Sequence, residues 1–359
     1  MNKKYLVIIL LVLIVISGVL IFRLSSPALF SFSKPVIKEV EPMPEPTKIA
    51  SFIAVGDISY SRSIERAYKK ADDMNYPFAL IGSYLHLADF VFGNLETPIT
   101  AGREIQSGEM IFRSDPGLEK VLKNNNFAIV SLANNHTPNF GDKGLEDTFS
   151  YLEKAGIKYV GAGNNELLAR QPVYITSNGF KFAFLAYNDS DVVPSSYEAS
   201  AEPGTAFMNI NHLAEDISLA KKESDFVVVS MHSGTEYVPK PNSRQIEFAH
   251  AAIDAGADLV IGHHPHVVQT LEEYQGKYIF YSLGNFIFDQ RLSDETEQGL
   301  LAKFRFNQAG LEGVELLPVY NNSLGRPEPA NETKSNTILK RLSFPISGIF
   351  SLMKTDIDL

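Results

Sequence analysis

Short apolar runs that each end abruptly in polar side chains constrain the fold of this chain more than any other feature. The clearest run reads Leu-Val-Ile-Gly-His-His-Pro-His at residues 259–266. Similar runs lead into Gly-Asp at 56–57, Gly-Asn-Leu-Glu at 93–96, Asn-Asn-His at 134–136 and Met-His at 231–232. Because ligands of open α/β sheets gather at the carboxyl ends of the strands, we expect these side chains to converge on one site.

The strand-like runs alternate with amphipathic helical patterns. Strands are predicted at residues 51–55, 89–92, 127–132, 182–186, 226–230 and 259–261, and helices at 63–71, 117–124, 144–155, 212–222 and 243–255. Strands separated by single helices favour a largely parallel sheet. After His266, the segments 267–274, 278–281 and 300–306 are joined by short turns, which favours antiparallel strands. The sequence therefore predicts an α/β fold, mostly parallel in its first half and antiparallel in its C-terminal strands.

An apolar N-terminal stretch at residues 5–22 is long enough to cross most of a hydrocarbon layer as a helix. Lys3 and Lys4 precede it, which predicts that the chain after Arg23 lies outside the cytoplasm. We expect a single-pass membrane anchor at 1–24, a Pro-rich spacer at 25–47, a main domain at 48–322 and a docked or interfacial tail at 323–359. A cleaved signal peptide is the competing interpretation of the N-terminus.

Composition narrows the chemistry of the predicted site. The chain of 359 residues has no cysteine, so thiolates and disulfides are excluded. Its formal net charge of −10, with no basic patch, argues against nucleic acid as a partner. Carboxylate, amide and imidazole ligands suit one or two divalent cations, for which manganese, zinc, iron and magnesium are the candidates.

Several candidate residues also have ordinary structural explanations. Asp57 is suited to cap a following helix, and Glu96 could be a solvated carboxylate. Asn134 and Asn135 belong to a residue type that is common in turns. Arg113 could orient an anionic substrate through a bidentate contact, or could equally lie on the surface.

The histidines are harder to explain structurally. His232 directly follows an apolar strand, where an imidazole rarely lacks a partner. His264 and His266 give the strongest local signal, because Pro265 fixes the backbone between two imidazoles and allows both to be aimed at one place.

Six motifs occur in an order that resembles a known family. They are Gly-Asp at 56–57, Gly-Asn-Leu-Glu at 93–96, Ala-Asn-Asn-His at 133–136, His-Ser-Gly-Thr-Glu-Tyr at 232–237, Gly-His-His-Pro-His at 262–266 and Tyr-Ser-Leu-Gly-Asn-Phe-Ile-Phe at 281–288. This order resembles the CapA family, the poly-γ-glutamate capsule-biosynthesis branch of the calcineurin-like metallophosphatase superfamily. The resemblance covers about residues 48–307 and implies a layered sheet sandwich flanked by helices.

The resemblance also implies roles for individual residues. It makes His136 the acid that protonates a leaving group. It places Asp57 and His266 on a first metal, and Glu96 as the bridge between two metals. The implied metal ligands are Asp57, Glu96, Asn135, His232, His264 and His266.

Two positions depart from the family pattern. Ser59 stands where phosphatases of this superfamily usually carry a histidine, so one metal is poorly held or relies on Asn285 or Asp289. Ser233 stands where the family commonly has an aromatic residue, so the family pattern does not predict which residue forms this part of the pocket wall. His263 is expected to point away from the site.

Two functions remain open from the sequence. In the first, the protein is a membrane-anchored, extracytoplasmic hydrolase or transferase with two metals, acting on phosphoryl or γ-glutamyl bonds of an anionic surface polymer or its precursor. In the second, it is a non-catalytic accessory subunit of a membrane synthase or export complex. The loss of a histidine at Ser59 favours the accessory subunit, whereas the retained ligand residues favour the hydrolase or transferase.

Overall fold

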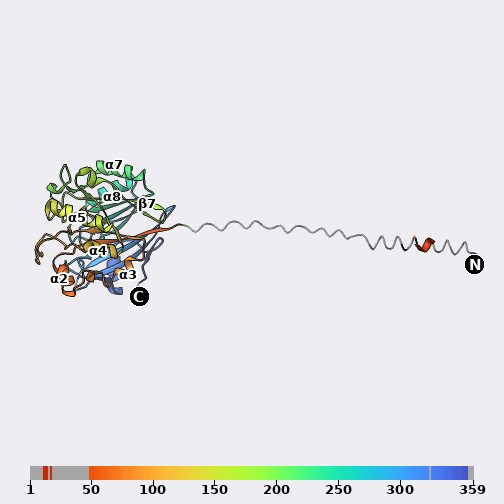
Figure 1. The fold of residues 1–359 in the computed structure, drawn as a ribbon, viewed down its shortest axis with the longest axis horizontal. Coiled ribbons are helices and arrows are strands. Elements are labelled where there is room, and N and C mark those ends of the chain that lie inside the picture. Colours follow the sequence, from red (N-terminus) through yellow and green to blue (C-terminus); the bar gives the residue numbers. More distant parts are fainter. Residues whose placement is uncertain (1–10, 15–16, 18–47, 323–324, 355–359) are drawn as a thin grey trace, which may run out of the picture. The chain divides into compact units, whose positions relative to one another are not determined.

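The computed structural model describes residues 11–14, 17, 48–322 and 325–354. The chain divides into two units, Met1–Pro46 and Thr47–Leu359, and the strands all belong to the second unit. Figure 1 shows this second unit as a layered arrangement of sheets and helices.

The expected single-pass membrane anchor is not supported. Among the described residues, no helix combines the length and the apolar character that a membrane crossing needs. Residues 11–14 and 17 are helical, and the other residues of the 5–22 stretch and of the 25–47 spacer lie outside the described part of the chain.

The first sheet contains nine strands. Strands β1 to β4 run parallel, and β14, β15 and β16 continue the sheet beyond β1 in antiparallel pairing. Both faces of β1 and β2 are covered, which explains their continuous apolar runs. The order is β16 (Pro327–Pro329), β15 (Gly310–Asn321), β14 (Gln298–Asn307), β1 (Ala50–Ile58), β2 (Phe90–Leu95), β3 (Phe127–Ser131) and β4 (Lys158–Val160), with β13 (Asn285–Ile287) on β1 and β17 (Phe350–Leu352) on β15.

The second sheet contains six strands. Four of them, β7, β9, β10 and β12, are parallel, and an antiparallel strand closes each edge. Its order is β11 (Leu271–Tyr274), β12 (Lys277–Phe280), β10 (Leu259–His263), β9 (Phe226–His232), β7 (Phe180–Asn188) and β6 (Val173–Ser177). A small antiparallel pair, β5 (Ala162–Gly163) and β8 (Gly204–Thr205), lies outside both sheets.

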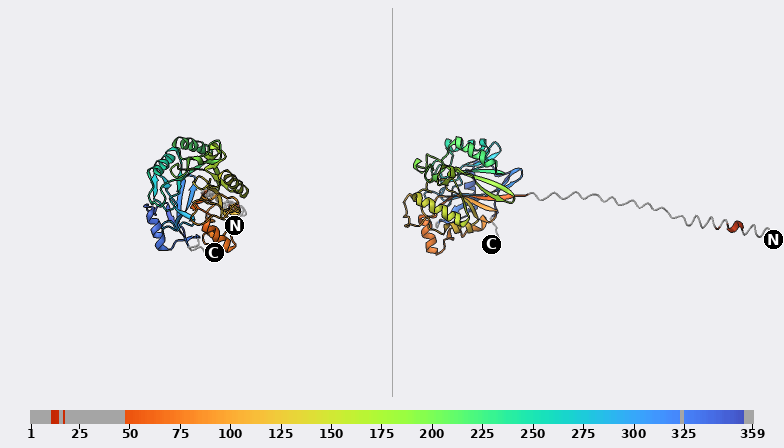
Figure 2. Two further views of the ribbon diagram at one scale, coloured as in Figure 1. Left: turned by 90° about the vertical axis from the view of Figure 1, so that its left-hand side faces the viewer. Right: turned by 45° about the horizontal axis from the view of Figure 1, so that its top comes forward.

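Helices cover the outer faces of both sheets, as Figures 1 and 2 show. One apolar core lies between the first sheet and its helices, and another between the second sheet and helices α7 and α8. The helices are α2 (Arg62–Ala71), α3 (Gly82–Leu85), α4 (Leu118–Asn124), α5 (Gly141–Ala155), α6 (Glu166–Arg170), α7 (Ile210–Lys221), α8 (Ser243–Ala255) and α9 (Glu332–Arg341), with short 3₁₀ turns at Tyr76–Phe78 and Ser195–Tyr197.

A third core joins the two sheets face to face, and we call it the between-sheet core. It is rich in stacked and edge-to-face aromatic rings, including Phe52, Phe92, Phe184 and Phe306. Aromatic pairs of this kind add stability beyond the area they bury. The resulting layers, helix, sheet, sheet and helix, confirm the expected α/β sandwich with parallel first-half strands and antiparallel C-terminal strands.

Strand periodicity carries polar residues to one end of the between-sheet core. Side chains of a strand alternate between faces, so Asn188 follows Phe182, Phe184 and Ala186 on the inner face of β7. The register then pairs Asn188 with His232 and His232 with His263 in the second sheet. In the first sheet it pairs Ser131 with Asn94, Asn94 with Asp57 and Asp57 with Asn285. Two rows of polar residues, one from each sheet, therefore border one end of the between-sheet core.

The C-terminal segment, for which a docked or interfacial tail is expected, packs against the rest of the main unit. Strands β16 and β17 pair with β15, and Ile338 of α9 is fully buried in the between-sheet core. These elements belong to the unit Thr47–Leu359. β6, β15 and α9 were absent from the predicted elements.

Candidate metal centre

Asp57 is placed by an irregular end of β1. The pairing of β1 with β2 shifts between Ala54 and Asp57, and the Asp57 N–H donates to Gly284 O at 3.0 Å. Gly56 is required here, because an added Cβ would lie only 1.9 Å from Gly284 O. The close crossing of these backbones turns the Asp57 carboxylate, which is fully buried, toward the second sheet.

The turn after β10 brings two histidines to Asp57. The His264 N–H donates to Asp57 Oδ2 at 3.3 Å, and His266 Nδ1 lies 3.3 Å from the same oxygen. His264 has φ of 96° and His266 has φ of 56°. Left-handed backbone is costly for residues other than glycine, and such strain concentrates at functional sites. The strain therefore supports a ligand-binding role for this turn.

Asn94 links both sheets at the centre of the site. Its Nδ2 lies 2.8 Å from Asp57 Oδ1, 3.0 Å from Glu96 Oε1 and 3.2 Å from His232 Nδ1. The Asn134 amide donates to Asn94 Oδ1 at 3.1 Å and so fixes which amide atom faces these groups. An amide nitrogen has two hydrogens for these three acceptors, so at least one acceptor is left to another donor or to a cation.

A chain of side chains continues from Asn94 to His136. His232 Nε2 lies 3.0 Å from Asn135 Oδ1, and Asn135 Nδ2 lies 3.3 Å from His136 Nε2. His136 Nδ1 lies 3.0 Å from Asn139 Oδ1. Because amide oxygens only accept, His232 Nε2 and His136 Nδ1 carry the protons in this arrangement, and the lone pair of His136 Nε2 faces Asn135.

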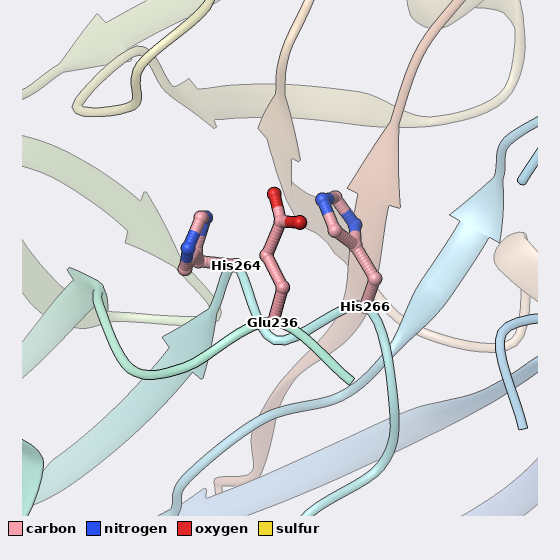
Figure 3. A group of neighbouring side chains, drawn as sticks. All are labelled: Glu236, His264 and His266. Carbon is pink, nitrogen blue, oxygen red and sulfur yellow. The ribbon is translucent and has the colours of Figure 1, made fainter. Parts of the chain in front are cut away.

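The candidate ligands form two overlapping groups. Ligand atoms of Asp57, Glu96 and His266 lie within 4.8 Å of one another, and so do those of Glu236, His264 and His266. Figure 3 shows the Glu236 carboxylate between the two imidazoles of the second group. The rings of His232 and His264 are 4.8 Å apart between centroids. The structure therefore brings these strand-end side chains close to one another.

Burial sets the protonation of the histidines. It lowers the pKa of His136 and of His264 to about 3, and it lowers the pKa of His232 well below its ordinary value. The neutral imidazole that results near neutral pH is the form that binds metals. His232 and His264 are thus prepared for ligation rather than for ion pairing, and His136 is likewise neutral.

The two carboxylates at the centre are shifted in opposite directions. Burial raises the pKa of Glu96 well above its ordinary value, and the charge of Asp57 adds to the effect. Burial also opposes ionisation of Asp57, but contacts with His263 and His266 outweigh it and hold its pKa well below the ordinary value. An added cation would favour the ionised form of both groups.

Buried polar atoms without a hydrogen-bond partner indicate whether these residues fit a metal. Glu96 Oε2 and His264 Nδ1 are buried and have no hydrogen-bond partner. Buried polar atoms are normally paired, and each unpaired one needs an explanation such as an ion. The donor set consists of carboxylate, amide and imidazole atoms, which suits a hard or borderline divalent cation. The residues therefore fit the expected metal.

The structure places Ser59 and the two residues that were expected to compensate for it. Ser59 is buried and its Oγ has no hydrogen-bond partner. Asn285 Oδ1 lies 2.9 Å from His266 Nδ1 and orients that ring. Asp289 forms an ion pair with Arg62 and accepts a 2.7 Å hydrogen bond from Ser63 Oγ, so its carboxylate is occupied by protein groups.

The side chain of His263 points in a different direction from the one that the sequence predicted. Its Nδ1 lies 3.4 Å from Asp57 Oδ1, so the side chain faces the site rather than away from it. Strand periodicity explains the error, because Leu259, Ile261 and His263 share the inner face of β10.

Arg113 is neither a surface residue nor directed at a substrate. Its fully buried guanidinium donates to Glu65 Oε1 at 3.1 Å, Asp115 Oδ1 at 2.6 Å, Thr100 O at 2.9 Å and Arg103 O at 2.8 Å. These contacts contradict both interpretations offered by the sequence and make Arg113 a structural residue that holds the loop after β2 against α2.

Two further site residues were missed by sequence reasoning. Asn94 could have been found, because Phe90, Phe92 and Asn94 share the inner face of β2. Glu236 lies in the irregular segment after β9, where no periodicity predicts the direction of a side chain. Only the three-dimensional turn reveals its position beside His264 and His266.

Relatives that match the chain include the following three. It is 33% identical over 302 residues to the capsule biosynthesis protein CapA of Bacillus anthracis, covering 80% of this chain and 72% of the relative. It is 35% identical over 301 residues to the PGA biosynthesis protein CapA of Bacillus subtilis, covering 82% and 77%. A probable polyglutamine synthesis accessory protein of Mycobacterium tuberculosis is 33% identical over 207 residues, covering 55% and 54%.

A solved structure and a family model complete the comparison. A hypothetical protein from Thermus thermophilus matches with a TM-score of 0.50 and 14% identity, covering 78% of this chain and 100% of that chain, which is a likeness in fold alone. A family model described as bacterial capsule synthesis protein PGA_cap matches residues 51–290. The CapA resemblance is therefore confirmed, and the chain belongs to the PGA_cap family of bacterial capsule synthesis proteins.

Proposed function

We propose that the protein takes part in the synthesis of a capsule or of poly-γ-glutamate as a metal-dependent hydrolase or transferase. Its substrates would be phosphoryl or γ-glutamyl bonds of an anionic polymer or of its precursor. The observation that carries the proposal is the convergence of Asp57, Glu96 and His266 on one point, with their ligand atoms within 4.8 Å of one another. Family membership and the names of the relatives support the biological setting.

Asp57, Glu96, Asn135, His232, His264 and His266 would hold one or two divalent ions. Such ions act as Lewis acids toward a carbonyl or phosphoryl oxygen and offset negative charge that develops during transfer. The protein contributes a buried setting, since Asp57, Glu96 and His232 are at most 1% exposed. Burial excludes water and strengthens each electrostatic contact within the site.

His136 is placed to handle a proton beside the proposed ligand Asn135. Its Nδ1–H is held by Asn139, while the lone pair of Nε2 faces the Asn135 amide. Phe112 packs on the imidazole at 3.9 Å between centroids and keeps the ring in place. A pKa near 3 means that His136 is neutral near neutral pH, so it must gain a proton during the reaction before it can donate one to a leaving group.

A second function, that of a non-catalytic accessory subunit, is favoured by Ser59. A metal position that lacks one imidazole would bind more weakly, and a family member is named as an accessory protein of polyglutamine synthesis. In this case the pocket would bind the polymer within the synthesis machinery without cleaving it.

Metal analysis followed by activity assays separates these functions. Residues 48–359 would be purified, analysed for manganese, zinc, iron and magnesium, and assayed against phosphoesters and γ-glutamyl peptides. The hydrolase proposal expects bound metal and turnover that disappears in Glu96→Gln and His264→Ala but persists in the exposed controls Glu146→Gln and His86→Ala. Metal binding with no turnover of either substrate class would contradict the hydrolase proposal and support the accessory function.

A further inference from the structure

The ligand set expected from the family lacks one imidazole in this chain. Ser59 stands at that position, and its buried Oγ contacts no hydrogen-bond partner. The Ser59 N–H donates to Ile287 O at 2.7 Å, which fixes the backbone there. A serine side chain is too short to reach as far as an imidazole, so a metal bound near His266 would need a ligand from elsewhere.

Glu236 lies at the right place to supply that ligand. One of its carboxylate oxygens lies within 4.8 Å of ligand nitrogens of both His264 and His266. Figure 3 shows the carboxylate projecting from its own loop into the space between the two rings. A single cation can reach atoms this far apart, because metal–ligand distances of about 2 Å place opposite ligands about 4 Å from each other.

A second observation concerns the His264 ring itself. His264 Nδ1 is buried, with the residue 4% exposed, and has no hydrogen-bond partner. An unpaired buried nitrogen is costly unless an ion or water occupies its lone pair. The unpaired nitrogen therefore supports a bound ion or water at the His264 ring, and the Glu236 carboxylate lies beside that ring.

The backbone holds Glu236 firmly against the histidine turn. The next residue, Tyr237, donates its N–H to Pro265 O at 2.9 Å, between His264 and His266. Tyr237 itself has a φ of 65°, so three non-glycine residues in the left-handed region meet at this point. Left-handed backbone is unfavourable for such residues and persists only where the surroundings enforce it. The loop is thus held in one conformation with Glu236 directed at the site.

Side-chain contacts also connect the loop that carries Glu236 to His266. The Gln290 amide lies 3.4 Å from Tyr237 Oη and 3.4 Å from the Asn285 amide, and Asn285 orients His266 at 2.9 Å. Glu236 is therefore linked to the His266 ring through both its backbone and its neighbours.

We infer that Glu236 is a metal ligand that completes the set left open by Ser59, and that it adapts the centre to bonds with a neutral scissile carbonyl. The inference rests on the proposed metal-dependent function. Asp57, Glu96 and Glu236 together would offset three of the four charges of two divalent ions. A phosphoryl dianion would then meet less positive charge and an opposing carboxylate, whereas an amide carbonyl carries no net charge to repel. The geometry thus favours γ-glutamyl amides over phosphomonoesters as the substrate class.

In that reaction, the C–N bond of the γ-amide breaks as a water oxygen bonds to its carbonyl carbon. The products are a carboxylate and a protonated amine, because both protons of the attacking water end on the departing nitrogen. No oxidant or further reactant is needed for this balance.

Metal titration provides the test. Metal-stripped wild type, Glu236→Gln, Glu236→Asp and the exposed control Glu247→Gln would each be titrated calorimetrically with Mn²⁺ and with Zn²⁺. Glu236→Gln should bind at least about tenfold more weakly or lose one equivalent of metal, because a ligand contributes at least as much as the groups that merely orient ligands. Glu236→Asp should recover part of the loss, and Glu247→Gln should match wild type. Circular dichroism and thermal unfolding would verify that each variant is folded.

A second measurement addresses charge selectivity. At saturating metal, Glu236→Gln should bind inorganic phosphate about tenfold more tightly than wild type does, because a like charge has been removed. Unchanged metal binding in Glu236→Gln would overturn the ligand assignment even if the wild type hydrolyses γ-glutamyl peptides. Weaker metal binding in Glu236→Gln would sustain it even if no hydrolysis is found. A wild type that binds no metal would overturn both proposals.

Discussion

The backbone N–H of His264 donates a hydrogen bond to Asp57 Oδ2 at 3.3 Å, and this contact joins the ends of strands from two different sheets. Asp57 ends β1 of the first sheet, whereas His264 follows β10 of the second. The between-sheet core fixes the separation of these strands, so packing far from the site sets the spacing of the ligands. Interiors are packed closely enough that such spacing is maintained to a fraction of an ångström.

Replacement of His136 by alanine should affect turnover more than metal binding. General acid–base groups typically contribute about 10²–10⁴-fold in rate, and we expect a loss in this range with metal content near that of wild type. Elemental analysis and the peptide assay would be run together, with His86→Ala as the exposed control. If His136→Ala loses metal as completely as His264→Ala does, His136 is a ligand and the assignment of the acid is wrong.

Replacement of Arg113 by methionine should destabilise the fold. It leaves the fully buried Glu65 carboxylate without its guanidinium partner, and breaking a buried pair costs about 3–5 kcal/mol in the free energy of unfolding. Arg66→Met removes a half-exposed side chain that pairs with Glu104 and should cost less than about 1 kcal/mol. Urea denaturation measures both. Unchanged stability together with lost substrate binding would restore Arg113 as a substrate ligand.

The metal-free protein should lose stability as the pH falls from about 6.5 toward 3. His136 and His264 have pKa values of about 3 in the folded state, and His232 is lowered as well, whereas unfolded histidines titrate near 6.5. The unfolded state therefore binds more protons throughout this window, and each histidine removes about 1.4 kcal/mol per pH unit. Urea denaturation at several pH values, with chelator present, tests the slope. A flat profile over this range would contradict burial of neutral histidines.

Replacement of Ile338 by alanine should destabilise the whole domain. Ile338 lies on α9 and is fully buried in the between-sheet core, where loss of a large aliphatic side chain costs about 2–5 kcal/mol. Leu352 lies in the same C-terminal segment but is 53% exposed, so Leu352→Ala should change stability little. Thermal unfolding of both variants would compare their stabilities, and we expect a single transition for each. Equal, small effects would mean that the segment after residue 322 is only loosely attached.

Periodicity in the sequence predicted much of the fold, because strands and helices impose their own repeats on apolar residues. The runs that became β1, β2, β3, β7, β9 and β10 were visible as apolar stretches. β15 was missed because the sequence at residues 310–321 mixes apolar residues with Glu, Gly and Pro and shows neither a continuous apolar run nor strict alternation. Pairing with β14 on one side and β16 on the other defines it as a strand.

The sequence by itself determined which ligand types are present and that they follow strand ends, since parallel strands bring their carboxyl ends to one edge. Asp57, Glu96, His232, His264 and His266 were found in this way. Tertiary structure alone decided the surroundings of Arg113 and Glu236. Arg113 depends on Glu65 and Asp115, which its own neighbours in sequence do not predict, and Glu236 depends on a loop conformation held by Pro265. The directions of their side chains follow from contacts between distant segments, and such contacts leave no periodic signal in the chain.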